Sequence, residues 1–134
     1  FINRIKMNKL IIDVASEKIF LMIISNASIY NITHENTKIN YEKLTIIIND
    51  FLLSKNLKIA DINAIYINKG PGSFAGIRNS ISVVKAFNVV KNIDYYCYNL
   101  DNFKGEKNLS YENIPDLCKK YKIKKNLINP IYIS

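Results

Sequence analysis

The segment Ile67–Phe87 reads INKGPGSFAGIRNSISVVKAF and carries the most informative motif of the chain. A short apolar run, Ala64–Asn68, leads into it and has the length of a buried strand. Pro71 stiffens the turn between two glycines, and Ser73 is a residue that commonly caps the start of a helix. The pattern therefore predicts a strand, a glycine loop and a helix over about Phe74–Lys91.

The glycine loop is compatible with a chemical site as well as with a turn. A strand–loop–helix junction can bind an anion with its free backbone N–H groups. This loop is not a Walker A motif, because no Lys-Ser or Lys-Thr follows its last glycine, and its G-x-G-x-x-x-G spacing does not fit a dinucleotide fingerprint. A structural turn is the favoured interpretation and an anion site the alternative; the residues of the motif are Gly70, Pro71, Gly72, Ser73, Gly76 and Arg78.

Apolar, β-branched runs predict the other strands. Three runs open the chain, and their short connections are typical of antiparallel hairpins. A helical pattern covers about Tyr41–Lys55, and a fifth strand follows the second helix. We therefore expect an α/β fold in β-β-β-α-β-α-β order, with a mixed five-stranded sheet and its helices on one face. The predicted strands are Lys9–Asp13, Lys18–Ile24, Ser28–Thr33, Ala64–Asn68 and Tyr95–Tyr98.

The domain organisation expected from the sequence is simple. Residues 7–100 form one lobe, and residues 101–134 form a linker and a short C-terminal tail. The polar stretch Asp101–Ser110 is interpreted as a surface linker, and Pro115 predicts a short helix over Ile114–Tyr121. Residues 1–6 precede Met7 and are interpreted as an extension.

The two predicted helices carry more apolar surface than one sheet face needs. In the first, Ile46 and Leu53 lie seven residues apart, opposite the stripe expected to cover the sheet. The second is apolar nearly all round, so it is covered on both sides. Either the C-terminal tail folds over it or a partner protein binds there, and the partner is favoured. The candidate interface residues are Ile46, Leu53, Ile77, Ser80, Ile81 and Val84, with Val83 and Phe87 as alternates.

Composition narrows the function classes. The net charge of +8 comes from 19 Lys and Arg residues, mostly Lys, in a chain rich in Ile, Asn and Tyr. Either nucleotide bias or a nucleic-acid surface accounts for it, and bias is favoured. One histidine and two widely spaced cysteines predict neither a metal site nor a disulfide. With no run long enough to cross a membrane, we expect a cytoplasmic protein without cofactor.

The glycine segment strongly resembles the signature of the TsaB (YeaZ) family, a glycoprotease-like branch of the actin-like ATPase superfamily. That signature usually runs GPGSFTGLR followed by a helix, against GPGSFAGIR here. MNKLIIDVAS resembles the family's opening strand, YEKLTIIINDFL its first helix and NPIYIS its closing tail. The resemblance covers about residues 7–100 and the last few positions, and implies a single actin-like (ribonuclease H-like) lobe.

The resemblance also implies a role and partners. It implies a non-catalytic subunit in the synthesis of threonylcarbamoyladenosine in tRNA, paired through its two N-terminal helices with a TsaD-like catalytic subunit. A TsaE-like ATPase would join the assembly, tRNA would be met indirectly through the complex, and the chain can also self-associate as a homodimer.

The sequence departs from the family pattern in three places. Val14 and Ala75 stand where the family usually has Thr, and most of the second lobe has no counterpart. Two alternatives to the scaffold therefore stay open. One is a tRNA-binding basic module that uses Lys119–Lys125 and Arg78. The other is a relic nucleotide-binding enzyme that uses Asp13 and the Gly70–Ser73 loop.

Overall fold

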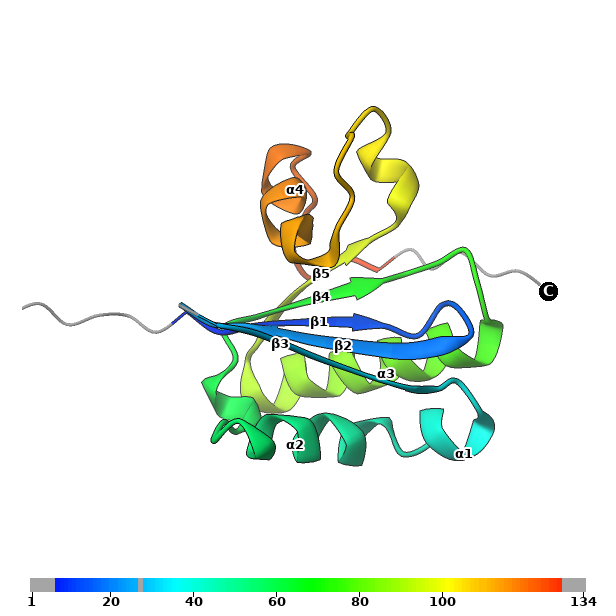
Figure 1. Cartoon of the computed structure of the whole chain (residues 1–134), viewed down its shortest axis with the longest axis vertical. Coiled ribbons are helices and arrows are strands. Elements are labelled where there is room, and N and C mark those ends of the chain that lie inside the picture. Colours follow the sequence, from blue (N-terminus) through cyan, green and yellow to red (C-terminus); the bar gives the residue numbers. More distant parts are fainter. Residues whose placement is uncertain (1–6, 27, 129–134) are drawn as a thin grey trace, which may run out of the picture.

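The computed structural model describes residues 7–26 and 28–128. The expected extension at residues 1–6 and the NPIYIS tail lie outside the described residues. Five strands form one sheet in the order β3-β2-β1-β4-β5, which Figure 1 shows edge-on. The strands are β1 Lys9–Asp13, β2 Lys18–Ile24, β3 Ile29–Glu35, β4 Ala64–Asn68 and β5 Asp94–Tyr98.

The sheet is mixed, as the sequence predicts. β1 pairs antiparallel with β2, and β2 pairs antiparallel with β3, so the chain opens as a meander. β4 lies parallel to both β1 and β5, because helices connect these strands. The predicted element order and the α/β class are confirmed. The carboxyl ends of β1, β4 and β5 therefore meet at one edge of the sheet.

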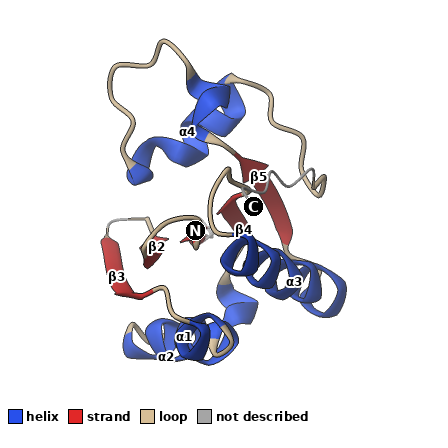
Figure 2. Cartoon of the chain, turned by 90° about the vertical axis from the view of Figure 1, so that its right-hand side faces the viewer, coloured by secondary structure: helices blue, strands red, loops and turns tan. Residues whose placement is uncertain are grey.

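Three helices cover one face of the sheet (Figures 1 and 2): α1 Lys38–Tyr41, α2 Leu44–Ser54 and α3 Phe74–Lys91. The sequence predicts one helix over Tyr41–Lys55, whereas the structure has two helices. The break falls at Lys43, whose φ of −101° and ψ of 18° leave the helical region. The long helix α3 has the bounds predicted for it, and Asn92, which follows its last residue, adopts the left-handed conformation.

The opposite face of the sheet is also covered, whereas the sequence predicts helices on one face only. Helix α4, Ile114–Lys120, packs there together with a 3-10 turn over Leu100–Phe103. The segment expected to be a surface linker carries Phe103, which is fully buried. The expectation of helices on one face only is therefore corrected: the chain has a second, smaller layer built from residues after β5.

Two apolar cores, one on each sheet face, follow from the alternation of side chains along the strands. Leu10 and Ile12 of β1 point toward α2 and α3, while Ile11 between them points toward α4. The larger core contains the buried sides of α2 and α3, and the smaller one is rich in aromatic residues. The last described residues return to the sheet, where Lys125 pairs with Tyr96 in an isolated bridge.

Candidate functional site

The glycine loop lies where β4 ends and α3 begins, pressed against the connection between β1 and β2. The Ser73 amide donates to the carbonyl of Ala15 at 2.9 Å. A Cβ added to Gly72 would lie 2.1 Å from that same carbonyl oxygen. A Cβ added to Gly76 would lie 2.5 Å from the carbonyl oxygen of Val14. The two glycines are therefore explained by the close approach of two backbone segments.

Three backbone amides of the loop, those of Gly70, Ser73 and Gly76, donate hydrogen bonds within the protein. The Gly70 amide donates to Asn68 Oδ1 at 2.9 Å, and the Gly76 amide donates to the Ser73 side chain at 3.3 Å. Ser73 is thus the N-cap that the sequence predicts. Arg78 points elsewhere, since its guanidinium carbon lies 6.0 Å from the ring centre of exposed Phe74. This geometry supports the structural turn over the anion site.

Asp13 is the buried carboxylate at the same edge of the sheet. Its Oδ1 accepts the Ala15 amide at 3.0 Å, and its Oδ2 accepts Asn68 Nδ2 at 3.2 Å. The hydroxyl of Tyr111, 98 positions away in the sequence, donates to Oδ2 at 2.8 Å. Three donors therefore converge on a carboxylate that is only 6% exposed.

Tyr111 belongs to the second layer and closes over this edge. Its ring stacks on Phe20 of β2, with ring centres 3.9 Å apart and planes at 18°. Burial raises the pKa of Tyr111, and the neighbouring charge of Asp13 raises it further. Nearby Tyr98 is fully buried with no hydrogen-bond partner for its hydroxyl among the described residues. A cavity of about 170 Å³ remains beside Asp13 and Tyr111.

We expect Tyr111→Phe to lower the free energy of unfolding by about 2 kcal/mol, because a buried carboxylate loses a charge-assisted hydrogen bond. The phenyl ring keeps its stack on Phe20, so packing changes little. Urea unfolding followed by circular dichroism measures the difference. Tyr30→Phe is the control, because Tyr30 is 36% exposed and its hydroxyl has no hydrogen-bond partner among the described residues; it should leave the free energy of unfolding within about 0.5 kcal/mol. If both variants were equally stable, the hydrogen bond from Tyr111 to Asp13 would not stabilise the fold.

The candidate interface residues fall into two groups. Ile46 and Leu53 are 58% and 59% exposed on the outer side of α2. The remaining four lie on the buried side of α3, against the sheet, where a partner cannot reach them in the folded chain; they are Ile77, Ser80, Ile81 and Val84. The alternates Val83 and Phe87 are half-buried. The structure therefore leaves Ile46 and Leu53 as the exposed members of the set.

Sequence reasoning missed Tyr111, since no local pattern marks a residue that reaches Asp13 from so far along the chain. In residues 7–26 and 28–128 no group of three or more His, Cys, Asp or Glu side chains is placed to hold a metal ion. Both cysteines are buried, and burial raises the pKa of Cys97 and of Cys118 to about 12. Over the same residues, no helix combines the length and apolar character that crossing a bilayer requires.

A mixed sheet with a meander edge, parallel strands joined through helices and a glycine junction before the long helix defines a single actin-like, ribonuclease H-like lobe. Residues 34–99, just under half of the 134-residue chain, match the family model described as TsaD: tRNA N6-adenosine threonylcarbamoyltransferase. The fold of this chain is similar to that of solved YeaZ structures.

Two examples illustrate the likeness to solved structures. YeaZ from Pseudomonas aeruginosa aligns with a TM-score of 0.64 at 18% identity, covering 69% of this chain and 44% of that one. A protein described as uncharacterized, with similarity to peptidase YEAZ from Pseudomonas aeruginosa, gives the same TM-score and identity and 43% coverage of its own chain. This chain thus spans less than half of either structure's length. A comparison with curated proteins finds no match.

Proposed function

We propose that this chain is a non-catalytic partner of a TsaD-like subunit in the cytoplasmic synthesis of threonylcarbamoyladenosine in tRNA. The family match over residues 34–99 supports this, because that segment runs from the end of β3 to the end of β5 and includes both long helices. A TsaE-like ATPase joins the same assembly, and tRNA is met through the complex. The same helices would also allow the chain to self-associate as a homodimer.

The observation that carries the proposal is a set of exposed apolar side chains on α1 and α2. Ile39, Ile46 and Leu53 succeed one another at intervals of seven residues, and their side chains are 68%, 58% and 59% exposed. The other side of α2 already packs on the sheet, where it buries Leu44, Ile48, Phe51 and Leu52. Apolar side chains that a helix presents away from its own core indicate a protein interface.

Helix α3 extends this apolar surface. Val89 and Val90 are among the most exposed apolar residues of the described chain, and half-buried Val83 and Phe87 lie on the same helix. Because α2 and α3 pack beside each other on one sheet face, a partner can contact both helices at once. A pair of helices from a related subunit would complete a bundle of the kind that buries apolar rows on adjacent helices.

The non-catalytic assignment rests on the hydrogen bonds that already engage the polar groups where β1 and β4 end. The carboxylate of Asp13 receives three hydrogen bonds, one of them from Tyr111 of the second layer. The amides of Gly70, Ser73 and Gly76 already have acceptors inside the chain. The relic enzyme that would use Asp13 and this loop therefore needs to break existing contacts first, which favours the scaffold.

The double variant Ile46→Lys, Leu53→Lys tests the interface. We expect it to weaken binding to the TsaD-like subunit at least a hundredfold by calorimetry, because two buried lysines without partners cost about 3 kcal/mol or more. The free energy of unfolding of this variant should change little, since both positions are exposed.

Leu109→Lys is the matched control for this experiment. Leu109 is a similarly exposed apolar residue, and it lies in the second layer on the opposite sheet face. The control should bind as tightly as the unmodified chain. Undiminished binding by the double variant would contradict the placement of the interface on α2.

A further inference from the structure

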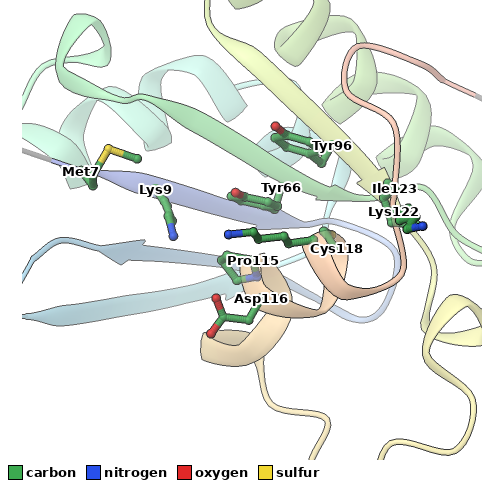
Figure 3. A pocket seen from close by; sticks show the side chains of 10 residues that line it. Met7, Lys9, Tyr66, Tyr96, Pro115, Asp116, Cys118, Lys122 and Ile123 are labelled. Carbon is green, nitrogen blue, oxygen red and sulfur yellow. The ribbon is translucent and has the colours of Figure 1, made fainter.

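A pocket of about 510 Å³ lies between the sheet and α4, on the face opposite α2 and α3 (Figure 3). Its size falls within the ~300–1,000 Å³ typical of small-ligand sites. β1, β4 and β5 supply one wall, and α4 with the turn after it supplies the other. The apolar helix surface described above does not reach it, so the pocket calls for a separate explanation.

Two tyrosines form an aromatic wall of this pocket. Tyr66 of β4 and Tyr96 of β5 are paired in register, and their rings stack with centres 5.1 Å apart and planes at 11°. Figure 3 shows the rings side by side, with Lys9 on the next strand. Neither hydroxyl has a hydrogen-bond partner among the described residues, and neither is sealed from solvent. Tyr66 is only 7% exposed and Tyr96 is half-buried, so the wall offers mainly the ring of Tyr96, with the Tyr66 ring stacked behind it.

Three lysines from separate elements surround the aromatic wall. Lys9 comes from β1 and is half-buried, Lys119 comes from α4, and Lys122 follows α4 in a left-handed turn. None of the three forms an ion pair within residues 7–26 and 28–128, although other lysines of the chain do. The one carboxylate in the lining is Asp116, so the pocket carries an excess of two positive charges.

We propose that this pocket binds a nucleotide, with the base against Tyr66 and Tyr96 and the phosphate near Lys9, Lys119 and Lys122. Aromatic side chains stack on bases of any sequence, and unpaired lysines nearby attract phosphate. The carboxylate of Asp116 can accept a hydrogen bond from an exocyclic amino group of the base. The same chemistry fits a free mononucleotide or one unstacked nucleotide of an RNA chain.

The test titrates the full chain with four probes and follows backbone amides by nuclear magnetic resonance. The probes are adenosine monophosphate, adenosine, inorganic phosphate and a short single-stranded oligoadenylate. We expect adenosine monophosphate to shift amides at Lys9, Tyr66, Tyr96 and Lys122, with a Kd of about 1 mM or tighter. Adenosine and phosphate, which each carry half of the recognised chemistry, should bind more weakly.

Variants separate the two parts of the pocket. Lys9→Gln with Lys122→Gln should weaken adenosine monophosphate about tenfold and flatten its salt dependence. Tyr96→Leu should weaken it at least about fivefold, whereas Tyr96→Phe keeps the stacking surface and should bind normally. Lys124→Gln is the matched control, because Lys124 is an exposed lysine of the same segment outside the lining.

The results test where the nucleotide binds and whether it is a free mononucleotide or part of an RNA chain. Displacement of bound oligoadenylate by adenosine monophosphate supports an RNA nucleotide, and binding of the mononucleotide alone supports a free ligand. No shift at about 10 mM overturns the proposal. Equal shifts from phosphate and adenosine monophosphate overturn base recognition, and full affinity in the Lys9 and Lys122 double variant overturns the location. The partner-binding proposal is unaffected by any of these results, because its surface lies on the other sheet face.

Discussion

Replacing Gly72 by alanine is expected to lower the free energy of unfolding by about 3 kcal/mol. The added Cβ would lie 2.1 Å from the carbonyl oxygen of Ala15 and 2.9 Å from its carbonyl carbon. Both are backbone atoms, which cannot rotate away, so the loop or the β1–β2 connection must move. That movement also strains the 2.9 Å hydrogen bond from the Ser73 amide to Ala15. Urea unfolding measures the loss.

Gly76→Ala tests the same close approach of the two backbone segments. Its expected effect on stability is opposite to the one that alanine normally has in a helix. Within a helix, alanine in place of glycine normally stabilises by about 1 kcal/mol. Here the added Cβ would lie 2.5 Å from the carbonyl oxygen of Val14, so Gly76→Ala should destabilise instead. Ser82→Ala, at an exposed position of the same helix, is the control and should be nearly neutral. A stabilised Gly76→Ala chain would show that α3 does not press on the β1–β2 connection.

Ile81→Asp is expected to unfold the chain, with a loss of about 4 kcal/mol or more. Ile81 is 7% exposed and lies in the core between α3 and the sheet, where a carboxylate would be removed from water. From the sequence alone, we expect this substitution to abolish partner binding while the fold stays intact. The burial of Ile81 changes that expectation to a loss of the fold itself.

Ser82→Asp is the matched control for Ile81→Asp. Ser82 is the next residue and is exposed on the outer side of α3. The free energy of unfolding of its variant should therefore lie within about 0.5 kcal/mol of that of the unmodified chain. Thermal unfolding by circular dichroism compares the two. A folded, cooperative Ile81→Asp chain would mean that α3 presents a different side to the sheet.

The order of helices and strands was predictable because each segment spaces its apolar residues in the way that is typical of a helix or of a strand. Lys9–Asp13, Lys18–Ile24 and Ala64–Asn68 have the bounds predicted for them, since turn residues flank short apolar runs. Phe74–Lys91 follows from Ser73 as its cap. The break between α1 and α2 was not predictable, because Glu42 and Lys43 are ordinary helix formers and only the local backbone shows the turn.

The orientation of α3 and the second layer were beyond sequence reasoning for a physical reason. A helix that is apolar nearly all round gives no contrast between its sides, and the close approach at Gly76 fixes which side meets the sheet. The stretch after β5 is polar on average, so one Phe103 or Tyr111 gives no periodic signal. The Tyr111–Asp13 contact and the Tyr66–Tyr96 pocket both depend on that layer.

Size-exclusion chromatography with light scattering, on this chain mixed with the TsaD-like subunit of the same source, tests the central claim most directly. We predict one peak whose mass equals the sum of the 15.5 kDa chain and one partner, and two separate peaks for the Ile46→Lys, Leu53→Lys variant. Separate elution of the unmodified chain, with both proteins folded and the partner competent, would contradict the account.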